Sequence, residues 1–127
     1  MLESNTQDPA PVVEITLKED QLIGFHIDNE PTKADYIFIN NLLSAHLVDK
    51  EKLLILLRLQ EMIDIEINYL FGELKTIFEF YKKKTKVAIV ATQAVQQQIN
   101  INKLVLEDIE IRCFDLEEEK VAIDWLS

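Results

Sequence analysis

The sequence predicts an α/β fold: one domain with the element order β-β-α-β-α-β-α-β-α. Strand-like runs alternate with segments of helical period along the chain. Two of those runs are apolar throughout, as strands buried on both faces are, and two alternating runs near the start are joined by a short polar link, as in a hairpin. Successive right-handed βα units then give a mainly parallel five-stranded sheet with an antiparallel N-terminal edge strand.

The beginning of the chain predicts a tail and then the hairpin. Residues 1–11 are polar, contain prolines and show no period, so we expect a flexible N-terminal tail before a domain that spans residues 12–127. In the run VVEITLK, the apolar Val13, Ile15 and Leu17 alternate with polar residues. The turn EDQ leads to a second alternating run, LIGFHI, and the two runs form the predicted hairpin.

A capping signal marks the start of the first helix. Asp35 stands three residues after Thr32, a variant of the capping box that satisfies free amides at a helix start. The residues expected to form the buried face of this helix recur at helical spacing: Ala34, Ile37, Phe38, Leu42 and Ala45.

The middle of the chain predicts a central strand and a long amphipathic helix. The run KLLILLRL holds consecutive large aliphatic residues from Leu53 to Leu57, which cannot all lie on one face, so this strand is buried on both faces. The segment MIDIEINYLFGELKTIFEFYKKK follows and has the most complete helical stripe. Its members are Ile63, Ile67, Leu70, Phe71, Leu74, Ile77, Phe78 and Tyr81.

The last third predicts two further strands, each followed by a helix. KVAIVAT is apolar throughout, and Thr92 can cap the short helix after it. IEIRCF alternates as an edge strand does, with Cys113 on its apolar side. Asp115 and Glu118 then form a second capping signal for the last helix. The inner face of that helix is expected to carry Val121, Ala122, Trp125 and Leu126.

These closing residues carry a family resemblance. KVAIVAT and then IEIRCFDLEEEKVAIDWLS resemble the closing half of the SpoIIAA-like domains, which belong with the STAS (sulfate transporter and anti-sigma-factor antagonist) fold and are grouped with CRAL-TRIO lipid-binding domains. The resemblance implies successive βα units and no cofactor. In regulatory relatives a phosphorylatable serine follows the central strand. The same junction here reads RLQEMID, Arg58 to Asp64, without serine or threonine, so this switch is not carried over.

Charge and composition exclude several classes of partner. A net charge of −10 argues against nucleic acid and anionic membranes, which both attract a basic face. No apolar run is long enough for membrane insertion, and the single cysteine fits a reducing compartment, so we expect a cytoplasmic protein. The one basic cluster, KKKTK from Lys82 to Lys86, is expected to close the long helix, with anion binding as the alternative.

The sequence predicts no catalytic residues, no metal site and no cofactor. Cys113 lies on the apolar side of its strand, where a thiolate is disfavoured, and the two histidines, His26 and His46, are isolated from it and from each other. Glu117 to Glu119 point about 100° apart around a helix, so they cannot converge on a cation and are explained by capping. The chain has only two glycines, and no phosphate-binding loop.

Two surfaces are candidates for association. A second apolar line on the long helix runs beside the core stripe through Ile65, Tyr69, Gly72, Thr76 and Phe80. Neighbouring elements can cover it, or it can be a homodimer or partner contact, with Gly72 allowing close approach. The other candidate is the sheet face opposite the helices, because right-handed crossovers place the helices on one face. That face is expected to carry Leu22, Gly24, Leu54, Leu56, Ala88 and Val90, with Glu14, Thr16, Glu110 and Arg112 around them.

Two functions follow as hypotheses. The first is a non-catalytic, STAS-like interaction or regulatory module that forms a homodimer and whose protein partner the sequence does not name. The alternative, suggested by the CRAL-TRIO grouping, is a carrier or sensor of a small apolar ligand. It predicts a cavity between the long helix and the sheet, lined by Phe71, Phe78 and Tyr81.

Overall fold

The computed structural model describes residues 12–15, 17, 21–28, 31–48, 50–60, 62, 64–99 and 109–127, and the predicted tail at residues 1–11 lies outside them. The α/β order is confirmed. The elements are β1 (Val12–Ile15), β2 (Leu22–Ile27), α1 (Lys33–His46), β3 (Lys52–Leu59), α2 (Asp64–Tyr81), β4 (Lys84–Val90), α3 (Gln93–Gln98), β5 (Ile109–Phe114), a 3₁₀ turn (Leu116–Glu118) and α4 (Glu119–Leu126).

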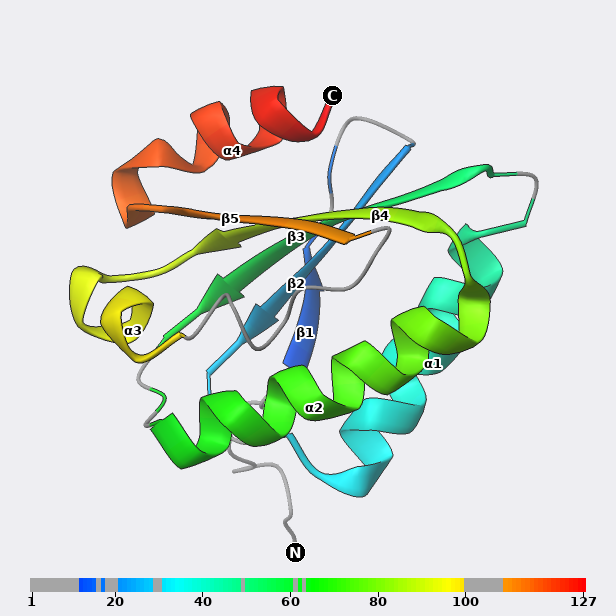
Figure 1. The fold of residues 1–127 in the computed structure, drawn as a ribbon, viewed down its shortest axis with the longest axis horizontal. Coiled ribbons are helices and arrows are strands. Elements are labelled where there is room, and N and C mark those ends of the chain that lie inside the picture. Colours follow the sequence, from blue (N-terminus) through cyan, green and yellow to red (C-terminus); the bar gives the residue numbers. More distant parts are fainter. Residues whose placement is uncertain are drawn as a thin grey trace, which may run out of the picture.

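The five strands form one sheet in sequential order, β1-β2-β3-β4-β5. β1 pairs antiparallel with β2, while β2, β3, β4 and β5 pair in parallel, as predicted. Helices α1 and α2 cover one face of the sheet and α4 covers the other (Figure 1). β3 is therefore the central strand, and its residues from Leu53 to Leu57 are all buried, as expected of a strand covered on both faces.

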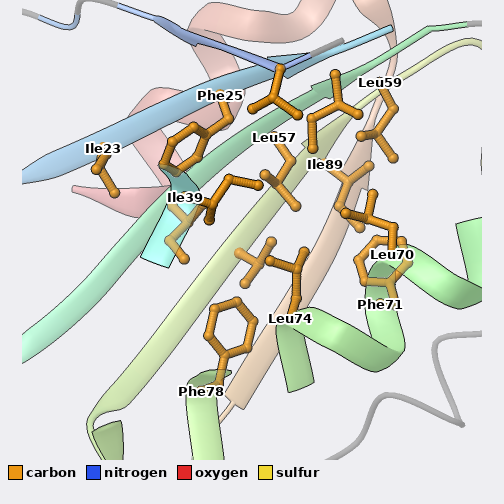
Figure 2. Packing of buried hydrophobic residues seen from close by; sticks show 14 of the residues in the cluster. Ile23, Phe25, Ile39, Leu57, Leu59, Leu70, Phe71, Leu74, Phe78 and Ile89 are labelled. Carbon is orange, nitrogen blue, oxygen red and sulfur yellow. The ribbon is translucent and has the colours of Figure 1, made fainter. Parts of the chain in front are cut away.

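The main core lies between the sheet and the helices α1 and α2. Phe25, Leu57 and Ile89 point from neighbouring strands toward Leu74 and Phe78 of α2 (Figure 2). Each of these side chains is at most 5% exposed. The stripe predicted for α2 thus packs against the main core, apart from Ile63, which lies outside the described residues. Such packing supplies most of the stability of a helix in water.

The start of α1 is as predicted, but its buried face is not. Asp35 Oδ2 accepts from the Thr32 amide at 2.6 Å, and the Asp35 amide donates to Thr32 Oγ1 at 3.2 Å, which completes the capping box. Ile39 and Leu43, four residues apart, are buried, whereas Ile37 and Phe38 are 54% and 41% exposed. The predicted face of α1 was wrong because apolar residues occur on two sides of this helix, and only one side meets the sheet.

Helix α4 corrects the expectation that every helix lies on one face. It packs on the opposite face and forms a second core there, whose buried members are Leu22, Leu54, Leu56, Ala88, Val90, Phe114, Ala122 and Leu126. The handedness rule governs a helix that links two parallel strands. Because α4 follows the last strand, the rule does not decide its side. Leu54 and Leu56 are 7% and 0% exposed and belong to an internal core.

Other details of this second face also differ from the prediction. Glu14 pairs with Phe25, a main-core residue, so Glu14 lies on the side of α1 and α2. Ile15 and Leu17 pack against the second core in its place, and Thr16 lies outside the described residues. Val121 of α4 is 52% exposed, although it was expected on the inner face.

The basic cluster does not belong to the long helix. α2 ends at Tyr81, and Lys82 adopts a left-handed conformation, with φ of 54°, that terminates it. Lys84 to Lys86 form the beginning of β4. Thr85 is 3% exposed and turns to the main core, so Lys84 and Lys86 lie on the α4 side of the sheet. The period of two across these residues is that of a strand, and the prediction of a helix end was wrong.

Candidate functional site

The apolar line on α2 is uncovered in the single chain. Ile65, Tyr69 and Phe80 are 70%, 53% and 77% exposed, and Gly72 and Thr76 are exposed between them. These five residues, called the α2 line below, recur at helical spacing on the side of α2 opposite its buried residues, and so face away from the sheet. The other described elements of the chain therefore leave this line exposed.

Gly72 has no packing reason within the chain. A Cβ placed on it meets nothing within 4 Å, apart from the helix backbone, and its φ is not positive. The Thr76 hydroxyl donates to the Gly72 carbonyl at 3.2 Å, which is an ordinary contact along a helix. Because glycine in a helix interior costs about 1 kcal/mol relative to alanine, its presence on the exposed face is locally unfavourable.

A groove between α1 and α2 lies beside the α2 line. It has a volume of about 410 Å³ and is lined by Pro31, Lys33, Tyr36, Ile37, Asn40, Tyr69, Glu73 and Ile77. The rings of Tyr36 and Tyr69 lie 6.0 Å apart between their centroids. Tyr69 belongs both to the groove and to the α2 line, so the exposed apolar surface continues from α2 onto Ile37 of α1.

The nucleophile and the histidines do not meet. Cys113 on β5 packs toward the main core, and burial raises the pKa of its thiol. His26 on β2 lies on the opposite face, three strand spacings away, which is about 14 Å. His46 ends α1, where its Nε2 lies 3.2 Å from the Gln21 carbonyl oxygen and burial lowers its pKa. The described chain thus holds no cysteine–histidine pair in reach for covalent catalysis.

The residues predicted to line an apolar cavity are placed in different surroundings. Phe71 and Phe78 are 4% and 5% exposed within the main core (Figure 2). Tyr81 is half-buried and its hydroxyl donates to Asn40 Oδ1 at 2.9 Å, which ties the end of α2 to α1. None of the three lines the groove between α1 and α2. Ligand carriage stays an untested prediction.

Two polar links at the ends of the strands were not predicted from the sequence. Arg58 of β3 donates from Nε to Glu119 Oε1 at 2.7 Å, and its Nη2 lies 2.6 Å from the same oxygen. Asp115 Oδ1 accepts from the Gln93 and Gln96 amides at 2.6 and 2.9 Å. Glu119 and Asp115 were interpreted only as helix-start residues, and no spacing in the sequence indicates partners so distant along the chain.

A comparison with protein families shows to which family this chain belongs. The family described as SpoIIAA-like matches residues 22–127, which cover all of the fold except its first strand. The chain belongs to the SpoIIAA-like family. Membership indicates an interaction or regulatory module in general terms. Neither the curated proteins nor the solved structures include a match to this SpoIIAA-like chain.

Two features are absent from the described residues of this SpoIIAA-like domain. Within the described ranges, no three histidine, cysteine, aspartate or glutamate side chains gather as they do around a metal ion. In the same part of the chain, no helix has the length and apolar character needed to cross a membrane. The most distinctive described surface is the α2 line with its adjoining groove.

Proposed function

We propose that this protein is a non-catalytic, STAS-like interaction module that self-associates through the α2 line. The observation that carries the proposal is an uncharged, exposed apolar line with an unexplained glycine at its middle. A helix interior selects against glycine unless a backbone must approach closely. No other element of the described chain approaches Gly72, so we infer that a second molecule packs against it.

The pattern of the line suits a twofold contact with a second copy. Apolar side chains flank Gly72 at similar distances on both sides, with Tyr69 and Ile65 before it and Thr76 and Phe80 after it. In an antiparallel pair of α2 helices whose twofold axis passes between Gly72 and Glu73, Tyr69 meets Thr76 of the second copy and Ile65 meets Phe80. Such a self-complementary contact is what a C2 dimer requires.

Charge favours this surface over others for self-association. Two copies that each carry a net charge of −10 repel each other, so contact is least costly where the surface is uncharged. The α2 line contains no ionisable acid or base that is charged at neutral pH. The Thr76 hydroxyl already donates to the Gly72 carbonyl, so its burial in such a contact leaves no unpaired donor, and the Tyr69 ring adds a large apolar surface.

The experiment is sedimentation equilibrium of the wild type and two matched variants at high micromolar concentration. Phe80→Lys places a charge in the line, whereas Val121→Lys places the same charge at an exposed apolar residue on α4, on the other side of the sheet. We expect dimers for the wild type and Val121→Lys, and monomers for Phe80→Lys with unchanged circular dichroism. A monomeric wild type, or a dimeric Phe80→Lys variant, contradicts the proposal.

A further inference from the structure

We propose that a hollow on the α4 side of the sheet binds a small multivalent anion of the phosphate class. The hollow has a volume of about 470 Å³, within the usual range for small-molecule sites. It lies at the N-terminal ends of β3 and β4, where α4 ends. Its lining includes Gln21, Lys52, Leu54, Lys84, Lys86 and Leu126. This site does not involve α2 and is independent of the proposed dimer.

The fold brings two positive charges together in this hollow. Lys52 and Lys84 are direct partners on adjacent strands, so their side chains leave the sheet on the same face. Among the described residues, neither lysine forms an ion pair or a side-chain hydrogen bond. Like charges placed directly opposite each other destabilise a sheet. A bound anion removes this repulsion, which no described carboxylate offsets through an ion pair with either lysine.

A third ammonium group, that of Lys86, is held in place in the same hollow. Lys86 Nζ donates to the Trp125 carbonyl at 3.3 Å and lies 4.9 Å from the centroid of the Trp125 ring. An ammonium group has three donors, so Lys86 keeps hydrogen-bonding capacity for a ligand. A cation already positioned beside the Lys52–Lys84 pair lowers the ordering cost of binding an anion.

The size of the ligand follows from the surrounding charge. Glu110 lines the same hollow and pairs in register with Lys86, so the excess of positive charge in the hollow lies at Lys52 and Lys84. An extended polyanion would run onto a protein surface whose net charge is −10. A compact anion stays within about 8 Å of the lysines, where their attraction exceeds the screened repulsion of distant carboxylates. The site therefore suits a small molecule with two or more phosphate charges.

The test uses inorganic pyrophosphate as the probe, titrated into ¹⁵N-labelled protein at constant ionic strength. Chemical-shift changes give the dissociation constant and locate the site. The double variant Lys52→Gln/Lys84→Gln removes the pair, and Lys33→Gln/Lys75→Gln removes the same charge from α1 and α2. We expect binding at least about tenfold weaker for the first, because both ammonium groups that can form charge-assisted hydrogen bonds with the anion are lost. We expect unchanged binding for the second.

A stability measurement distinguishes a ligand site from a structural role. Without pyrophosphate, the Lys52→Gln/Lys84→Gln variant should unfold at a temperature equal to or above that of the wild type, because the like-charge repulsion is removed. Saturable pyrophosphate binding, stronger than that of orthophosphate and centred on the starts of β3 and β4, supports the proposal. Absence of saturation, equal weak binding of both anions, or wild-type affinity in this double variant overturns it.

Discussion

Replacing Gly72 with alanine tests the conformational argument for the α2 line. The residue lies in the interior of α2, is exposed, and leaves open space where a Cβ would be. Alanine therefore brings its full helix propensity, about 1 kcal/mol, without a steric cost inside the chain. We expect the free energy of unfolding of the monomer to rise by about 1 kcal/mol, which corresponds to a midpoint about 4 °C higher for a domain of this size.

The assay is urea unfolding followed by circular dichroism at low and at high protein concentration. At low concentration the Gly72→Ala variant should be more stable than the wild type. At high concentration this advantage should shrink, because the added methyl group separates the two α2 backbones and weakens the dimer. A variant that is less stable at low concentration refutes the reasoning about Gly72. An advantage that does not depend on concentration leaves the glycine unexplained and counts against its role in a dimer.

Three other substitutions probe the rest of the fold. Trp125→Ala should lower the free energy of unfolding by about 2 kcal/mol, because the half-buried ring packs against Phe114 and under Lys86; an effect near zero in urea titration would disprove this anchoring. Burial lowers the pKa of His46, so on acidification the unfolded chain takes up a proton at this side chain before the folded protein does. The free energy of unfolding should therefore fall as the pH drops below about 6.5 and level off below the folded pKa. In unfolding curves measured across that pH range, His46→Gln should lessen this loss. Burial raises the pKa of Cys113, so the folded protein should react with a disulfide reagent at mildly alkaline pH far more slowly than the unfolded protein, and equal rates would contradict its burial.

The sequence predicted correctly those features that depend on residues close together along the chain. The Thr32–Asp35 pair starts α1, and Thr92 starts α3 by accepting from the Val95 amide. These caps satisfy free amides within one turn, so their signal lies within a few residues. The continuous aliphatic run in β3 likewise identified the central strand, because only a strand covered on both faces buries such a run.

The incorrect predictions concern features that tertiary contacts determine. Ile37 and Phe38 suit a buried face as well as Ile39 and Leu43 do, and only the position of the sheet selects the second pair. The side taken by α4 depends on which face can bury Ala122 and Leu126, and the pair Arg58–Glu119 exists only once that side is chosen. Sequence periodicity contains no information on such a choice. The candidate sheet interface was lost for this reason, while the α2 line remained exposed.

The two proposed sites lie on opposite faces of the sheet, and this arrangement has a consequence for regulation. Along β3, Lys52 and Leu54 turn toward α4, whereas Leu53 and Ile55 turn toward α1 and α2. A dimer formed through α2 therefore leaves the lysine hollow open. Because the ligand and the second copy share no surface, an anion can influence self-association only through the packed residues of β3 and β4 or through the negative charge that it adds. Coupling of this kind must be reciprocal: an anion that strengthens the dimer binds the dimer more tightly by the same factor.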